Sequence, residues 1–115
     1  MTDSEIIQSA AQKCSKLECD GTVKVLHYVM SEHGIKHFVF QGYVDRISTK
    51  DTIPLHYWIK LPNNYIVDYK CQMWLGEDAP NGIFNAKDFP DFIYHGHLVE
   101  LKVPQIIYQI LTDEF

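Results

Sequence analysis

Apolar side chains near the start of the chain recur every three or four residues, which is the spacing of one helix face. Thr2 and Glu5 precede this pattern at the spacing of a capping box, in which each side chain bonds the other residue's backbone N–H. We therefore predict a first helix that ends at about Lys16. Cys14 falls on its apolar stripe and is expected in the core.

A second helical pattern opens at Cys19 and stops at Gly34. Gly34 suits a helix end because glycine adopts positive φ without steric cost. Cys19 is therefore expected at a helix N-terminus, where backbone N–H groups have no partner within the helix. The apolar face of this helix consists of Val23, Leu26, Val29 and Met30.

Five later segments are rich in β-branched and aromatic residues and are predicted as strands. A polar loop at Asp45–Thr52 separates the first two, and the last two are expected to turn at His95-Gly96. The predicted strands are Ile35–Val44, Leu55–Leu61, Tyr65–Cys71, Phe92–Tyr94 and His97–Val103.

Two further segments complete the predicted arrangement. Trp74–Pro90 is expected to be irregular, and a loop of this length often forms the wall or lid of a cleft. Pro104 suits the start of a last helix. We expect this helix to bury the side formed by Ile106, Ile107, Ile110 and Leu111.

The turn Pro62-Asn63-Asn64 decides which side chains of the flanking strands share a face. A two-residue loop would place His56 and Asp68 on opposite faces. Pro suits the first position of a three-residue loop, and Asn tolerates the left-handed third position. We therefore predict the three-residue loop. It pairs Trp58 with Asp68 and sets His56 diagonal to Asp68, about 7 Å apart at Cα.

Composition and charge narrow the class of protein. The 115 residues are 46% hydrophobic and 22% charged with a net charge of -5, which is typical of a soluble globular protein and predicts one domain, residues 1–115. Without a basic run or a long apolar run, we expect neither nucleic-acid nor membrane binding. The acidic N-terminus is unlike a signal peptide, so a cytoplasmic location is expected, in the producing cell or in a host that the protein enters.

The elements together predict an α+β fold, with two N-terminal helices packed on an antiparallel sheet of four or five strands and a short C-terminal helix. Three cysteines without paired spacing are expected as free thiols. Cys19, His56 and Asp68 have the order of a thiol acyl-transfer triad. A helix start and a nearby imidazolium both favour the thiolate, the histidine protonates a leaving amine, and the aspartate orients the ring.

These three residues belong to a longer pattern that resembles the transglutaminase-like branch of the papain-like cysteine proteases. The resemblance covers about residues 17–70 and implies a papain-like core. It also implies that Cys19 is the nucleophile, His56 the base and Asp68 the orienting residue, with Trp58 beside the site. In order, its elements are Cys19, Gly34-Ile35, Gly42-Tyr43, His56-Tyr57-Trp58 and Ile66-Val67-Asp68.

We therefore expect a cysteine-dependent enzyme that transfers the acyl group of an amide through a thioester. Peptide or isopeptide hydrolysis, deamidation of Gln or Asn side chains, and transamidation share this intermediate and stay open. Hydrolysis is favoured because nothing suggests an amine-binding pocket. A protein or peptide substrate is expected, with Trp58 and Trp74 in substrate binding and with no cofactor or metal.

Two other interpretations stay open. A catalytically silent papain-like binding module would have an unreactive Cys19 and would use the aromatic residues between Trp74 and Phe92 as an exposed protein-binding patch. A metal-dependent hydrolase would combine His95 and His97, which alternate along a strand, with His37 as zinc ligands.

Overall fold

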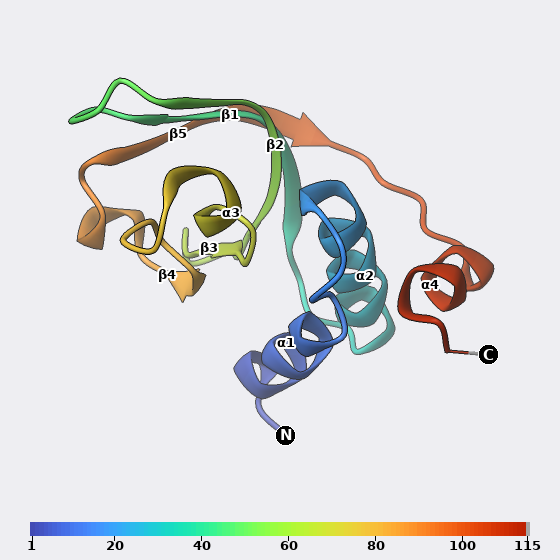
Figure 1. Ribbon diagram of the computed structural model, residues 1–115. Coiled ribbons are helices and arrows are strands. Elements are labelled where there is room, and N and C mark those ends of the chain that lie inside the picture. Colours follow the sequence, from blue (N-terminus) through green and yellow to red (C-terminus); the bar gives the residue numbers. More distant parts are fainter. Residues whose placement is uncertain (115) are drawn as a thin grey trace.

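The computed structural model describes residues 1–114 and has an α+β architecture, as the sequence predicts (Figure 1). Two short helices interrupt the series of strands: α3 lies between β3 and β4, and the 3-10 helix η1 lies between β4 and β5. In chain order, the elements are α1 (Asp3–Gln12), α2 (Cys19–Glu32), β1 (Phe38–Arg46), β2 (Thr52–Lys60), β3 (Ile66–Asp68), α3 (Gln72–Leu75), β4 (Gly82–Phe84), η1 (Ala86–Asp88), β5 (Phe92–Val99) and α4 (Gln105–Thr112).

The predicted capping box begins α1. The Thr2 backbone N–H donates to Glu5 Oε1 at 2.9 Å, and the Glu5 N–H donates to Thr2 Oγ1 at 3.2 Å. The helix ends at Gln12, earlier than predicted, and a turn carries Cys14 into the core. The Cys14 carbonyl oxygen accepts hydrogen bonds from the Leu17 N–H at 3.0 Å and from Lys70 Nζ at 2.8 Å, so this turn is tied to the segment after β3.

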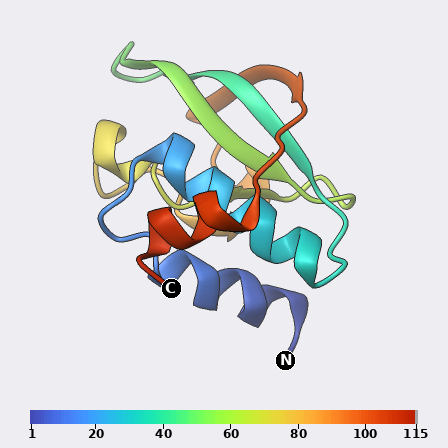
Figure 2. The same cartoon turned by 90° about the vertical axis from the view of Figure 1, so that its right-hand side faces the viewer.

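The strands form one antiparallel sheet in the order β4-β3-β2-β1-β5. Figure 2 shows α1, α2 and α4 together on one side of this sheet, while β1 and β2 continue past them over α3, β3 and β4 (Figure 1). Both faces therefore bury apolar side chains. Val39, Ile59 and Val67 face the helices, whereas Trp58, Ile66, Phe84 and Phe92 belong to a second cluster.

The β2–β3 hairpin has the predicted register. Ile59 lies opposite Val67, and Lys60 lies opposite Ile66. One step further along the hairpin, the same register places Trp58 opposite Asp68. Asn64 adopts the left-handed conformation expected at the third loop position, with a φ of 69°. The Leu61 N–H donates to the Tyr65 carbonyl at 2.9 Å and closes the loop. The three-residue loop is confirmed.

The predicted turn at His95-Gly96 is wrong, because β5 runs without interruption from Phe92 to Val99 beside β1. Gly96 lies opposite Gly42 in this pairing, and a Cβ atom on Gly96 would lie 2.6 Å from Cη2 of Trp58. The glycine is therefore present because the Trp58 ring occupies the space of a side chain, rather than because the backbone turns.

Two other predictions need correction. Trp74–Pro90 is not an unstructured lid, since it includes β4, which pairs with β3, and the 3-10 helix η1. The last helix begins after Pro104 as predicted, but its apolar side is not buried, with Ile106 52% and Ile110 58% exposed. The helix is attached instead through Tyr108, whose ring stacks on Tyr28 at 4.5 Å between centroids.

Candidate functional site

Three different elements supply Cys19, His56 and Asp68. Cys19 is the first residue of α2, His56 lies at the centre of β2, and Asp68 is the last residue of β3. Because the three-residue loop sets His56 and Asp68 diagonally on one face, their side chains meet across the hairpin. Cys19 borders the same small space as Asp68, and its thiol interacts with the His56 ring. The three residues that the sequence places in a triad therefore lie together.

The carboxylate of Asp68 is buried and accepts three hydrogen bonds. Its Oδ2 accepts from His56 Nε2 and from the Tyr94 hydroxyl, each at 2.7 Å, and its Oδ1 accepts from the Lys70 backbone N–H at 2.9 Å. Only 3% of Asp68 and none of His56 is exposed. A buried carboxylate needs such donors, and because it can only accept, the proton of this contact belongs to His56 Nε2.

The imidazole of His56 is held in its protonated form. Burial of the ring lowers its pKa, but the hydrogen bond to Asp68 and the neighbouring Cys19 thiol raise it more, so the pKa is about 9 instead of 6.5. Nδ1 is buried and forms no regular hydrogen bond within residues 1–114. Since Nε2 is occupied by Asp68, Nδ1 is the nitrogen left to face the sulfur of Cys19.

Tyr94 is part of this arrangement, although no sequence motif marks it. Its hydroxyl donates to Asp68 from β5, 26 positions further along the chain. Burial, and then the charge of Asp68, raises the pKa of Tyr94 strongly, so the phenol stays a neutral donor. No local pattern could have revealed this contact, because β5 pairs with β1 and not with β3.

Exposure separates Cys19 from the other two thiols. Cys14 and Cys71 are completely buried, and burial raises the pKa of Cys14 to about 11 and that of Cys71 to about 12. Cys19 is half-buried at the start of α2. All three cysteines are free, as predicted, and Cys19 is the one that solvent reaches.

The two tryptophans differ from the expectation of a shared substrate-binding role. Trp58 lies beside His56, with 6.2 Å between ring centroids, but it is only 2% exposed and offers a substrate almost no surface. Trp74, on α3, is 56% exposed. The expected aromatic patch between Trp74 and Phe92 is also wrong, because Phe84 and Phe92 point into the second core cluster.

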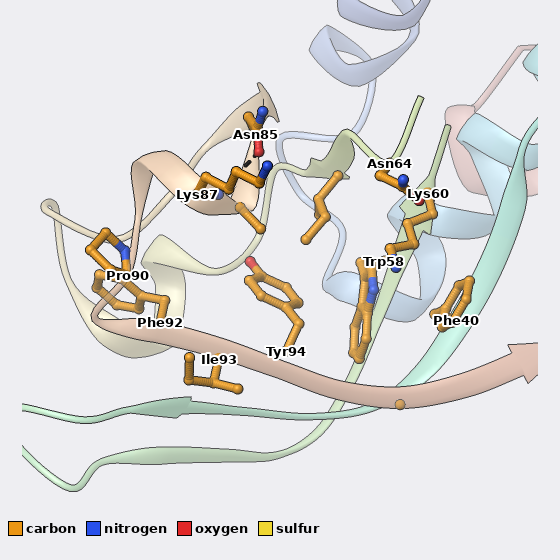
Figure 3. Close-up of a pocket in the computed structure, with 13 residues that line it drawn as sticks. Phe40, Trp58, Lys60, Asn64, Asn85, Lys87, Pro90, Phe92, Ile93 and Tyr94 are labelled. Atoms are coloured by element: carbon orange, nitrogen blue, oxygen red, sulfur yellow. Dashed lines mark hydrogen bonds between the residues drawn. The ribbon is translucent and has the colours of Figure 1, made fainter. Parts of the chain in front are cut away.

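A cavity of about 400 Å³ opens behind Tyr94 and Trp58 (Figure 3). By contrast, the space beside Cys19, which is bordered by Thr22, Tyr57 and Asp68, is too narrow to hold a water molecule. The cavity next to Tyr94 therefore lies at the side of the hydrogen-bonded carboxylate and does not include Cys19.

The proposed zinc ligands do not meet. Within residues 1–114, no group of three or more His, Cys, Asp or Glu side chains is placed to hold a metal ion. His37 Nε2 lies 2.8 Å from Nδ1 of His27, whereas His95 lies beside Asp45 on the neighbouring strand. His37, His95 and His97 therefore do not form a zinc site, and the interpretation of the protein as a metal-dependent hydrolase with these ligands is wrong.

Comparison with known proteins gives no relative for this chain. No protein-family model matches the sequence, and no curated protein or solved structure matches it either. Among the described helices, none has the length and apolar character needed to cross a membrane.

Proposed function

We propose that this protein is a cysteine-dependent amide hydrolase with a papain-like, transglutaminase-like core. The observation that carries the proposal is that the two ring nitrogens of His56 have different environments. Nε2 is fixed by the buried carboxylate of Asp68, and the other nitrogen is left for the thiol of Cys19 at the start of α2. This is the arrangement that thiol acyl transfer requires, with a nucleophile, a base and an orienting residue.

In the proposed reaction, the Cys19 thiolate attacks the carbonyl carbon of an amide and the carbonyl π electrons move to oxygen. When this intermediate collapses, the C–N bond breaks and the amine leaves with the proton from His56 Nδ1, which produces a thioester. Water then attacks the thioester and gives a proton to Nδ1. The C–S bond breaks, a carboxylic acid leaves, and the Cys19 thiolate and protonated His56 are restored.

The backbone N–H of Cys19 is the proposed donor to the oxyanion. Cys19 occupies the first position of α2, where an N–H has no acceptor within the helix, and the preceding residue, Glu18, makes no side-chain cap. Positive charge on His56 and the N-terminal end of the helix dipole both favour a thiolate at this place. A protein or peptide is the proposed substrate, because the thiol is the exposed member of the site.

Alkylation of the three cysteines tests the activated thiol. The protein is exposed briefly to limiting iodoacetamide at several pH values, and the labelled peptides are mapped by mass spectrometry. We expect selective labelling of Cys19 at mildly acidic pH, and loss of that selectivity in His56→Gln. Buried Cys14 and Cys71 are internal controls. Equal labelling of all three, or labelling of Cys19 that is unaffected by His56→Gln, would overturn the proposal.

Acyl transfer itself is tested with p-nitrophenyl acetate. We expect a burst of p-nitrophenol, an acetyl group on the Cys19 peptide and then slow turnover as water releases it. Cys19→Ala should lower turnover about a thousandfold or more while the far-ultraviolet circular dichroism stays unchanged. Cys14→Ala is the matched control and should keep the activity. If the acetyl group stays on Cys19 and water does not release it, the protein has a reactive thiol but is not a hydrolase, and the proposal is contradicted.

A second candidate function is the catalytically silent papain-like binding module. Two observations favour it: the space beside Cys19 does not admit water, and none of the His56 ring is exposed. The two candidates differ in the alkylation experiment. A silent module gives a Cys19 that reacts slowly and with an ordinary thiol's pH dependence, whereas the hydrolase gives the selective, His56-dependent reaction.

A further inference from the structure

The cavity in Figure 3 has an apolar middle and a polar group at each end. Its middle is formed by aromatic side chains, among them Trp58, Tyr94 and Phe92. Lys60 and Asn64 come from the β2–β3 hairpin, whereas Asn85 and Lys87 come from the segment at η1. Figure 3 shows the two lysines well apart, with Trp58 and Tyr94 between them.

The charge of this cavity is opposite to that of the whole protein. The chain has a net charge of -5, yet the residues that line the cavity include two lysines and no aspartate or glutamate. Within residues 1–114, neither Lys60 nor Lys87 appears in an ion pair. Lys60 Nζ lies 5.3 Å from the centroid of the Phe40 ring, so its charge is held at the cavity wall.

Carboxamide groups accompany both cations. The Asn85 side-chain oxygen accepts a hydrogen bond of 3.1 Å from the Lys87 N–H, which orders this end of the cavity. The side-chain amide of Asn85 keeps its two N–H donors, and Asn64 brings a second carboxamide to the other end. Ammonium and amide N–H groups donate hydrogen bonds to carboxylates. Pockets for small ligands commonly combine a few such polar groups with a mostly apolar lining.

We propose that the cavity binds an elongated ligand with an aromatic or apolar middle and one carboxylate at each end. The apolar middle lies against Tyr94 and the small exposed edge of Trp58, and the carboxylates reach Lys60 and Lys87. A volume of about 400 Å³ is within the range of small-ligand sites, roughly 300–1,000 Å³. The inference does not depend on catalysis by Cys19, because it holds for a hydrolase and for a silent module alike.

A matched series of three probes tests this inference. The probes are 1,4-phenylenediacetate with two carboxylates, phenylacetate with one, and the neutral diamide of the first. The chain has two tryptophans, so a Trp74→Phe background leaves Trp58, in the cavity wall, as the only tryptophan, whose fluorescence is excited selectively over that of the tyrosines. We expect the dicarboxylate to bind most tightly, the monocarboxylate several-fold more weakly and the neutral diamide most weakly of the three.

Two substitutions assign the two ends. Lys60→Gln and Lys87→Gln should each weaken binding of the dicarboxylate by a factor of about two to five, as for exposed charge pairs, and leave phenylacetate binding nearly unchanged. Lys36→Gln, an exposed lysine outside the cavity, is the control. Thermal unfolding of each variant checks that the fold is retained. Equal binding of all three probes, no binding of any, or indifference to both substitutions would overturn the inference.

The same titration with acetyl-Glu-Ala-Phe-Ala-Glu-amide identifies the source of the ligand. Tighter binding of this peptide than of phenylenediacetate assigns the site to an acidic peptide segment, and weaker binding assigns it to a free dicarboxylic acid. Either result requires that the peptide with Gln in place of Glu does not bind. Binding of that neutral peptide would contradict recognition through the carboxylates.

Discussion

The Tyr94 hydroxyl donates to the same oxygen of Asp68 that holds His56, with both contacts at 2.7 Å. The carboxylate of Asp68 is therefore shared between an imidazole and a phenol. Each donor stabilises the negative charge of Asp68, so each weakens the hydrogen bond that the carboxylate forms with the other donor. Tyr94 thus acts on His56 through Asp68 and is a positioning residue of the proposed site.

Tyr94→Phe removes one of these two donors without changing the shape of the side chain much. Asp68 then interacts more strongly with His56, and we expect the pKa of His56 to rise further, as measured by NMR titration of its ring. Loss of a hydrogen bond to a buried carboxylate should also cost about 1–3 kcal/mol in the free energy of unfolding. Tyr65→Phe, an exposed tyrosine, is a suitable control. A lower His56 pKa in Tyr94→Phe would contradict this coupling.

The raised pKa of His56 predicts how stability depends on pH. Protonated His56 is favoured in the folded protein, so its contribution is fully present below its ordinary pKa of 6.5 and is lost as the pH rises through about 9. The loss should be roughly 3 kcal/mol. Urea unfolding of the wild type and of His56→Gln between pH 6 and about 9.5 measures it as the change in their difference.

Above this window the buried thiols add a loss of the same sign. Cys14 and Cys71 have raised pKa values in the folded protein, so unfolding is favoured once their thiols can ionise in the unfolded chain. Wild type and His56→Gln share this term, which therefore cancels in their difference. A difference in stability that stays constant from pH 6 to about 9.5 would contradict the pKa assigned to His56.

Gly96→Ala tests the close approach of β5 to Trp58. The added Cβ would lie 2.6 Å from Cη2 of Trp58, so the ring or the strand must shift. We expect a loss of roughly 1–3 kcal/mol in the free energy of unfolding and a changed fluorescence of Trp58. Leu98→Ala, on the same strand and 58% exposed, should change stability by less than about 0.5 kcal/mol. Similar losses for both variants would show that Trp58 does not require the glycine.

Substitution of Asn64 tests the hairpin that aligns His56 with Asp68. Its φ of 69° is unfavourable for most side chains and free of cost for glycine. Asn64→Ala should therefore lower the free energy of unfolding by about 1 kcal/mol, whereas Asn64→Gly should leave it nearly unchanged. Chemical denaturation of the two variants gives the comparison. Equal effects of Ala and Gly would contradict the left-handed conformation of this residue.

Features that depend on neighbouring residues could be predicted from the sequence. The capping box at Thr2, the start of α2 at Cys19 and the register set by Asn64 are local, because each depends on a few adjacent side chains. The side-by-side position of His56 and Asp68 follows from that register. This is why two members of the proposed triad could be placed together before the structure was known.

Features that depend on packing over long sequence distances could not be predicted. Gly96 has the character of a turn residue, and only the Trp58 ring beneath it explains a straight strand. Tyr94 reaches Asp68 because β5 joins the sheet on the far side of β1. The apolar residues of α4 have helical spacing, but the spacing cannot say that Ile106 and Ile110 lie outside the core.

The position of β5 has a consequence for how the protein is made. Cys19, His56 and Asp68 all lie in the first 68 residues, but the strand that carries Tyr94 is added at the outer side of β1. During synthesis on a ribosome, the carboxylate of Asp68 therefore remains without its phenol donor until residue 94 has emerged and β5 has joined the sheet. The buried hydrogen-bond network at Asp68 is completed only when β5 has formed.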